Sequence, residues 1–132
     1  MNGKETILIA DDGEINRAIL RNLFEDDYNL LEAENGEQAL ILLRQYRERI
    51  AAVLLDLVMP EKDGYEVLQE MGEDKRLYHA PVLVITADDS LGSRARVFRL
   101  GASDVITNPF DPDEVKNRVN NITELGRNRR QL

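Results

Sequence analysis

Five short apolar runs alternate with longer amphipathic segments along this chain, and the alternation strongly restricts the possible folds. The runs are residues 6–10, 28–33, 51–55, 81–86 and 104–107. Three of them are almost wholly apolar, as expected for strands that are covered on both faces. Strands that alternate with helices form parallel sheets through right-handed crossovers. We therefore predict an α/β fold in which helices cover both faces of a doubly wound, five-stranded parallel sheet.

Several segments between these runs carry signals for helix ends. A capping residue is followed three positions later by an acid or amide in three pairs, which are Asn35 and Gln38, Asp63 and Glu66, and Asp111 and Glu114. Pro112 suits a first helical position. Gly72 and Gly101 fit C-terminal caps, where a left-handed backbone is needed. Apolar stripes in the first and last helices are expected to face the core, and they consist of Ile15, Ile19 and Leu23, and of Val115, Val119 and Ile122.

Three aspartates stand where predicted strands end. Asp11 and Asp12 follow the first run, and Asp56 follows the third. In open parallel sheets functional sites lie outside the carboxyl ends of the strands, so these carboxylates converge if the first and third strands are neighbours. Carboxylates that repel one another either raise the pKa of at least one of them or recruit a cation, and oxygen ligands with water suit Mg²⁺ best. A carboxylate beside Mg²⁺ can also attack a phosphoryl group.

The composition disfavours several other classes of protein. The chain of 132 residues suits one domain, and its net charge of −8 disfavours direct nucleic-acid binding, which depends on neutralising phosphates. The absence of cysteine excludes disulfides, thiolate metal sites and thiol catalysis. No stretch approaches the roughly 20 apolar residues of a membrane span, and residues 1–5 lack a signal-peptide pattern. We expect a soluble, cytoplasmic protein without membrane attachment.

Four strings of residues resemble the receiver domain of bacterial two-component response regulators, the CheY-like proteins. They are IADDGEINR at 9–17, LLDLVMPEKDGYEVL at 54–68, VLVITADD at 82–89 and GASDVITNPF at 101–110. The resemblance extends in order and spacing from about Glu5 to Leu125. It implies a flavodoxin-like sheet with strand order 2-1-3-4-5. It also implies a phosphoryl group received from a sensor histidine kinase or phosphotransfer protein, with Mg²⁺ (or Mn²⁺) as cofactor.

The resemblance implies a role for each matching position. Asp56 would be the phosphoacceptor. The metal would be held by Asp56, by Asp12 directly, by Asp11 through water, and by the backbone carbonyl of Val58. Thr86 would be the switch hydroxyl that turns toward the phosphoryl oxygens. The remaining positions, which would surround the phosphate or shape the loop beside Asp56, are Ala87, Asn108, Pro109, Pro60 and Gly64.

Two positions depart from the family pattern. Asn108 stands where the family has a Lys whose ammonium pairs with the phosphoryl group, so a charge-assisted bond of roughly 1.5–3 kcal/mol is lost or weakened. Val105 stands where the family has an aromatic switch residue, and a β-branched aliphatic side chain cannot swing between exposed and buried positions as Tyr does. We predict a receiver that binds Mg²⁺ but whose phosphorylation or signalling is atypical.

Three classes of function remain open. A receiver that is phosphorylated on Asp56 is favoured by the three acids and Thr86. A pseudo-receiver that binds proteins independently of phosphorylation is favoured by Asn108 and Val105, and it ranks close behind. An aspartyl-phosphate hydrolase would need a second Asp two positions after the nucleophile, where this chain has Val58. We therefore expect a signalling module rather than an enzyme.

The sequence also suggests partners. We expect residues 1–125 to form the receiver domain, and residues 126–132 to be a basic tail or the start of a linker helix to an output domain. We hypothesise a homodimer across the fourth helix, fifth strand and fifth helix. The fourth helix carries Arg94, Arg96 and Arg99, which would contribute to a charged dimer face. A solvated polar face is an equally good interpretation of these residues. The kinase contacts that we hypothesise are Asn16, Arg17, Leu20 and Arg21.

Overall fold

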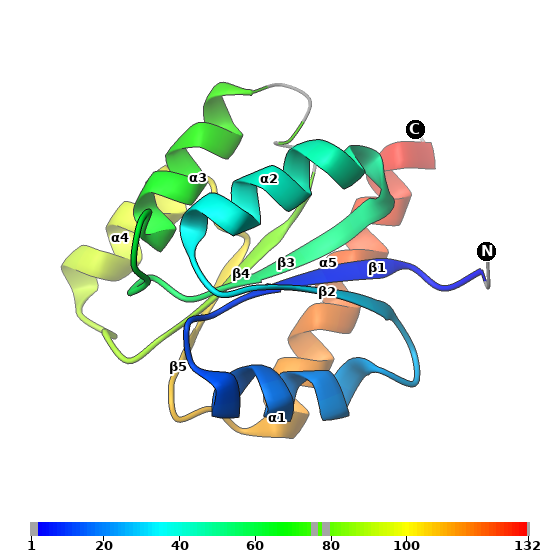
Figure 1. Cartoon of the computed structure of the whole chain (residues 1–132), viewed down its shortest axis with the longest axis horizontal. Coiled ribbons are helices and arrows are strands. Elements are labelled where there is room, and N and C mark those ends of the chain that lie inside the picture. The colour runs from blue at the N-terminus through cyan, green and yellow to red at the C-terminus, as the bar shows by residue number, and fades with distance from the viewer. Residues whose placement is uncertain (1–2, 75–76, 78–79, 132) are drawn as a thin grey trace.

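The predicted strands form one parallel sheet with the order β2-β1-β3-β4-β5 (Figure 1). The structure is a computed structural model that describes residues 3–74, 77 and 80–131. Its strands are β1 (Thr6–Ala10), β2 (Asn29–Ala33), β3 (Ile50–Leu55), β4 (Val82–Thr86) and β5 (Asp104–Thr107). Its helices are α1 (Glu14–Phe24), α2 (Gly36–Tyr46), the short 3₁₀ helix η1 (Arg47–Arg49), α3 (Gly64–Glu73), α4 (Leu91–Arg99) and α5 (Pro112–Gln131). The predicted α/β architecture and strand order are confirmed.

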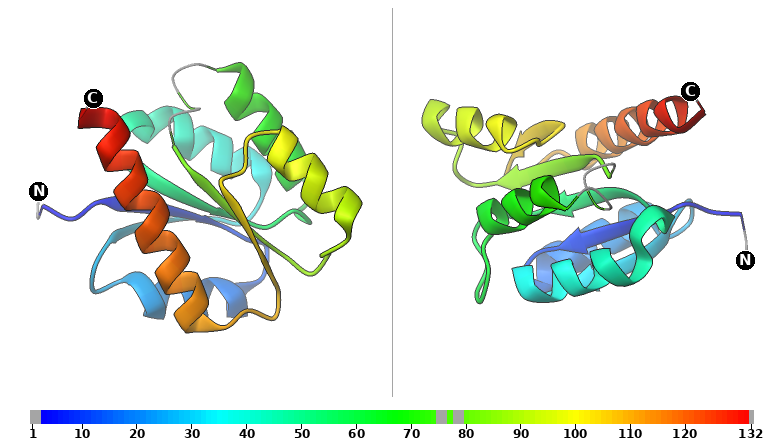
Figure 2. Two further views of the ribbon diagram at one scale, coloured as in Figure 1. Left: turned by 180° about the vertical axis from the view of Figure 1, so that it is seen from behind. Right: turned by 90° about the horizontal axis from the view of Figure 1, so that it is seen from above.

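Helices cover both faces of the sheet, as predicted. The helices α2, α3 and α4 lie on one face and α1 and α5 on the other (Figure 2). Side chains of each group pack against the strands in a separate apolar cluster. Successive residues of a strand serve opposite faces: Val53 belongs to the first cluster and Leu54 to the second. Burying an apolar side chain of this kind contributes about 1.5–3 kcal/mol. The two clusters fix the register of the strands and with it the positions of the residues at the strand ends.

The expected capping residues begin three of the helices. Asn35 accepts a hydrogen bond from the backbone N–H three residues later, at 2.8 Å. Asp63 and Glu66 form a reciprocal capping box, with bonds of 2.9 Å and 3.4 Å. The carboxylate of Asp111 instead accepts the backbone N–H of Asp113, at 2.9 Å. Local sequence therefore determines where α2, α3 and α5 start.

The predicted core face of α1 is wrong for Ile15 and Ile19, whereas Leu23 packs against the apolar cluster as predicted. Ile15 is 77% exposed and Ile19 is 41% exposed, whereas Leu20 and Phe24 are buried against the sheet and α5. Arg17 is also buried because its guanidinium donates to the backbone carbonyl of Asp11, at 2.8 Å. The hypothesis that Arg17 and Leu20 contact a kinase is therefore wrong, because neither side chain is available at the surface.

Two expectations about helix ends have different outcomes. Gly101 has a φ of +107° directly after α4, as a left-handed cap requires. Gly72 does not end α3, because the helix continues to Glu73.

The helix α5 runs without a break through residue 126 to Gln131, so the boundary expected after residue 125 lies within one helix. The side chains of residues 125–131 and the whole of Leu132 lie outside the described structure.

Among the described residues, no helix combines the length and the apolar character that crossing a membrane requires.

Candidate functional site

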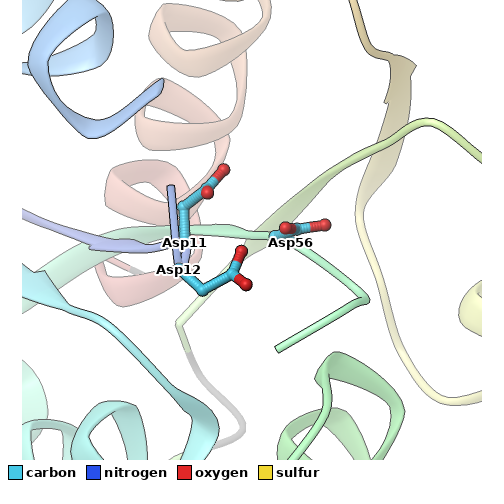
Figure 3. Close-up of side chains that lie close together, drawn as sticks. All are labelled: Asp11, Asp12 and Asp56. Carbon is cyan, nitrogen blue, oxygen red and sulfur yellow. The ribbon is translucent and has the colours of Figure 1, made fainter. Parts of the chain in front are cut away.

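The three aspartates predicted to converge do so at one edge of the sheet. The strands β1 and β3 are neighbours with Ala10 opposite Leu55, so the residues after them emerge side by side. The backbone N–H of Asp56 donates to the carbonyl of Ala10 at 2.9 Å and fixes this arrangement. Carboxylate oxygens of Asp11, Asp12 and Asp56 lie within 4.8 Å of one another (Figure 3). Parallel-strand topology thus creates the acidic cluster.

The cluster is electrostatically unfavourable as it stands. Burial raises the pKa of Asp56 to about 6, and the charges of Asp11 and Asp12 add to the effect although the Val58 N–H opposes it. Burial also raises the pKa of Asp11, although the hydrogen bond from the backbone N–H of Gly13 opposes this rise. Among the side chains that the structure describes, those of residues 3–74, 77 and 80–124, no Lys or Arg forms an ion pair with these three acids, although the charge of Arg17 opposes the rise in the pKa of Asp11. The arrangement therefore favours a bound cation, and its all-oxygen donors match the preferences of Mg²⁺ and Mn²⁺.

Asp11 and Asp12 have different surroundings. Asp11 is 6% exposed, and its Oδ1 accepts the backbone N–H of Gly13 at 2.8 Å. Its Oδ2 accepts the side-chain amide of Asn16, at a longer 3.4 Å. Asp12 is exposed. The Asp11 carboxylate is therefore held by its own loop, whereas that of Asp12 is open to solvent.

The loop after Asp56 depends on two glycines. A Cβ on Gly64 would lie 2.5 Å from the carbonyl oxygen of Asp56 and 2.7 Å from Cα of Leu57, so a larger residue does not fit. Gly64 also donates its N–H to the carbonyl of Leu57, at 2.9 Å. A Cβ on Gly36 would lie 2.1 Å from the carbonyl oxygen of Lys62, and sequence reasoning did not identify this contact. Close packing of α2 and α3 against the loop thus fixes its path.

The other residues predicted for this loop lie at the surface. Val58 is 73% exposed, and its backbone N–H donates to Oδ1 of Asp56 at 3.2 Å. Pro60 is exposed as well. The contact of Val58 with Asp56 is therefore made by its backbone, and its side chain is exposed to solvent.

Thr86 ends β4 and is 2% exposed. Its hydroxyl oxygen accepts the backbone N–H of Asp88, at 3.1 Å, and its carbonyl accepts the N–H of Asn108, at 2.7 Å. Ala87, the next residue, is exposed. The backbone of Thr86 thus binds the backbone of Asn108, while its hydroxyl accepts a hydrogen bond from its own loop.

The two positions that we expect to depart from the family pattern, Asn108 and Val105, occupy different environments. Asn108 is partly exposed at the end of β5, and the peptide bond to the exposed Pro109 is cis. Val105 is 4% exposed and belongs to the apolar cluster beneath α2, α3 and α4, with Val97 and Ala102. The side chain at position 105 is therefore a core residue in this structure.

Comparisons with known proteins identify the family. The model of the response regulator receiver domain matches residues 7–120. The chain is 38% identical over 121 residues to histidine kinase P4 of Formosa agariphila, covering 92% of this chain and 9% of that protein. It is 36% identical over 123 residues to the alkaline phosphatase synthesis transcriptional regulatory protein PhoP of Bacillus subtilis, covering 92% and 49%. The chain thus spans at most about half the length of these curated relatives.

A solved structure supports the same assignment. The CheX–CheY–BeF3–Mg complex from Borrelia burgdorferi contains a chain that matches with a TM-score of 0.81 and 29% identity, covering 87% of this chain and 86% of that one. The matched residues include the acidic cluster, all of the sheet except the first residue of β1, and the first part of α5. This chain therefore belongs to the response regulator receiver domain family of two-component signalling.

Proposed function

We propose that Asp56 accepts a phosphoryl group from a phosphohistidine of a sensor kinase or phosphotransfer protein. A carboxylate oxygen of Asp56 forms the new bond to phosphorus, the phosphorus–nitrogen bond breaks, and its electron pair returns to the imidazole ring. The observation that carries the proposal is the set of three carboxylates within 4.8 Å of one another. Asp56 is the member of this set that combines partial exposure with a central place at the end of β3.

Residues of the cluster would hold Mg²⁺ or Mn²⁺. We assign direct contacts to Asp12, Asp56 and the carbonyl of Val58, because the Asp11 oxygens already accept N–H donors from Gly13 and Asn16. When bound, the ion would offset the negative charge between the carboxylate of Asp56 and the phosphoryl group. The chain itself positions the acceptor through the strand register and the packed loop after Asp56.

Asn108 makes this receiver atypical. It is neutral, and its backbone is tied to Thr86 at the edge of the sheet where the family places an ammonium group. The hydroxyl of Thr86 can still turn toward the phosphoryl oxygens and donate its proton without adding charge. We therefore expect slow phosphorylation that relies on the metal and on Thr86.

Labelling with acetyl phosphate and Mg²⁺, followed by intact-protein mass spectrometry, tests both parts of the proposal. Asn108→Lys should label about tenfold or more faster than the natural chain, the effect of one charge-assisted hydrogen bond. Asp56→Asn should not label. Equal rates for the natural chain and Asn108→Lys would contradict the role of Asn108. Unchanged labelling of Asp56→Asn would contradict the acceptor assignment.

Burial of Val105 favours a second candidate, a pseudo-receiver that binds proteins independently of phosphorylation. A side chain that is 4% exposed in the core offers no switch between two positions. Amide NMR distinguishes the two candidates. Shifts around Thr86 with Mg²⁺ alone would favour the pseudo-receiver, whereas further shifts on adding beryllofluoride would favour phosphorylation.

Two surfaces suit the proposed partners. Ile15 and Ile19 form an exposed apolar stripe on α1, next to the acidic cluster, and we assign kinase docking to this stripe together with the partly exposed Asn16 and Arg21. A homodimer would use α4, β5 and α5, with Leu91 and Phe98 exposed on α4. Asp104 of this face already pairs with Arg118 of the same chain, so it is engaged within the molecule.

The continuous helix α5 would connect the receiver to an output domain in a longer protein. It extends beyond Ile122, which packs against the sheet, to Gln131. The PhoP protein of Bacillus subtilis, of which this chain matches 49%, is named a transcriptional regulatory protein. Direct nucleic-acid binding by the receiver itself remains disfavoured by the net charge of −8.

A further inference from the structure

A chain of polar contacts joins the β4–α4 loop to α3. The carboxylate of Asp88 accepts the backbone N–H of Ser90 at 3.0 Å and the hydroxyl of Ser93 at 2.6 Å. The hydroxyl groups of Ser93 and Tyr65 are 2.6 Å apart. Ser93 has a single hydroxyl proton, which it gives to the carboxylate, so Tyr65 donates to Ser93. We call Tyr65, Ser93 and Asp88 the hydroxyl chain.

This hydroxyl chain reaches the switch residue. The backbone N–H of Asp88 donates to the hydroxyl oxygen of Thr86, at 3.1 Å. The oxygen that would approach a phosphoryl group is therefore held by the same residue whose carboxylate binds Ser93. A movement of Thr86 and a movement of the first turn of α4 are consequently linked through Asp88.

The helix α4 has little other anchorage. Val97 is its single buried residue, and Leu91 and Phe98 are 86% and 46% exposed. Tyr65 holds α4 at a second point, because the guanidinium carbon of Arg96 lies 3.8 Å from the centroid of its ring. Elements with few buried apolar contacts change position at low free-energy cost. The contacts of Tyr65 are thus a large part of what fixes α4.

We propose that the hydroxyl chain is the latch through which phosphorylation reaches α4 in this receiver. The proposal rests on the proposed function, because it assumes that Thr86 turns toward a phosphoryl group on Asp56. That turn gives up the bond from the Asp88 N–H, shifts the loop and separates Ser93 from Tyr65. The latch supplies a route to α4 that does not involve Val105, which is buried in the core.

Reciprocity gives the latch a measurable signature. If the latch exists only in the unphosphorylated conformation, removing it favours the phosphorylated one and tightens binding of a phosphoryl mimic. Tyr65→Phe deletes the donated hydrogen bond and keeps the ring beneath Arg96. We expect the beryllofluoride concentration for half-saturation, measured with excess Mg²⁺ from the amide signal of Thr86, to fall about two- to tenfold, the effect of one neutral hydrogen bond.

Three further variants complete the experiment. Ser93→Ala should tighten binding to a similar extent as Tyr65→Phe, and Ser93→Thr, which keeps a hydroxyl, should return it toward the natural value. Tyr28→Phe is the matched control, because its hydroxyl bonds Asn120 at 2.8 Å on the opposite face of the sheet. It should leave beryllofluoride binding unchanged. Hydrogen exchange of the α4 amides without beryllofluoride should be faster in Tyr65→Phe than in Tyr28→Phe.

The outcomes separate the latch from the proposed function. A Thr86 signal that responds to beryllofluoride with equal or weaker affinity in Tyr65→Phe would overturn the latch and leave phosphorylation on Asp56 intact. A natural chain whose Thr86 signal does not respond to beryllofluoride would overturn the proposed function, and the latch with it. Tightening in Tyr28→Phe as large as in Tyr65→Phe would also overturn the latch.

Discussion

Replacing Asp56 by Asn should stabilise the metal-free protein at neutral pH and leave it nearly unchanged in acid. The pKa of Asp56 is raised from 3.8 to about 6, chiefly by burial. The folded protein therefore binds a proton more readily than the unfolded chain between these values. Stability should fall as pH rises through this window, because the ionised carboxylate is disfavoured only in the folded state.

The size of the effect follows from the two pKa values. At 1.36 kcal/mol for each tenfold change in proton affinity, the difference between 3.8 and about 6 corresponds to roughly 3 kcal/mol. Asp56 is partly exposed, and solvent screening reduces such effects, so we expect a gain of about 1–2 kcal/mol in the free energy of unfolding of Asp56→Asn above about pH 7. The gain should shrink as pH falls through 6 and vanish well below pH 3.8, where Asp56 is protonated in both the folded and the unfolded protein.

Urea unfolding followed by circular dichroism, with a chelator present and at several pH values, measures this difference. Glu48→Gln is the control, because it removes one negative charge from an exposed position on η1. Adding Mg²⁺ should stabilise the natural chain more than Asp56→Asn and shrink the difference. Equal stability of Asp56→Asn and the natural chain at about pH 8, or a gain in stability that grows toward low pH, would refute the claim that the ionised Asp56 carboxylate destabilises the folded protein.

Three further predictions follow from the packing. Gly64→Ala should lower the free energy of unfolding by about 1–3 kcal/mol, because its Cβ would meet backbone atoms at 2.5 Å and 2.7 Å; unchanged urea unfolding would contradict this. Gly72→Ala should raise it by about 0.5–1 kcal/mol, because the residue lies inside α3 with open space around it, and a loss in the same assay would be inconsistent with that. Ile15→Ser should change the free energy of unfolding by less than about 0.5 kcal/mol, because Ile15 is exposed. It should slow phosphotransfer from a cognate kinase and leave labelling by acetyl phosphate unchanged. Slowing of both reactions would place Ile15 in the acceptor site instead.

The strands and the acidic cluster could be predicted from sequence because both depend on short-range patterns. Each apolar run forms a strand, and three of the five starts differ by one residue, as for β4, which begins at Val82 after Pro81. The parallel order then brought Asp11, Asp12 and Asp56 together without any knowledge of side-chain packing. Caps such as Asn35 and the box at Asp63 are likewise local.

The core face of α1 could not be predicted from periodicity alone. Two apolar stripes compete on this helix, one with Ile15 and Ile19 and the other with Leu20 and Phe24. Packing against the sheet and α5 selects the second stripe, and the bond from Arg17 to the Asp11 carbonyl lets a charged residue lie beside it. Tertiary contacts therefore decide which stripe is buried.

Contacts between segments that are distant in the chain could not be predicted from the sequence either. The close approach of Gly36 to Lys62 joins α2 to the loop after β3, and no local motif announces it. Tyr65 and Ser93 are separated by 28 residues, and Tyr65 resembles an ordinary surface aromatic until α4 is placed beside it. Both contacts depend on how helices settle on the sheet, which short-range patterns do not specify.

Calorimetric titration of Mg²⁺ into the natural chain, Asp12→Asn and Asp56→Asn tests the central claim most directly. If Asp11, Asp12 and Asp56 form one metal site, the natural chain should bind one ion per molecule, and each variant should bind it far more weakly because one ligand carboxylate is missing. No heat of binding in the natural chain, or undiminished binding in both variants, would contradict the account.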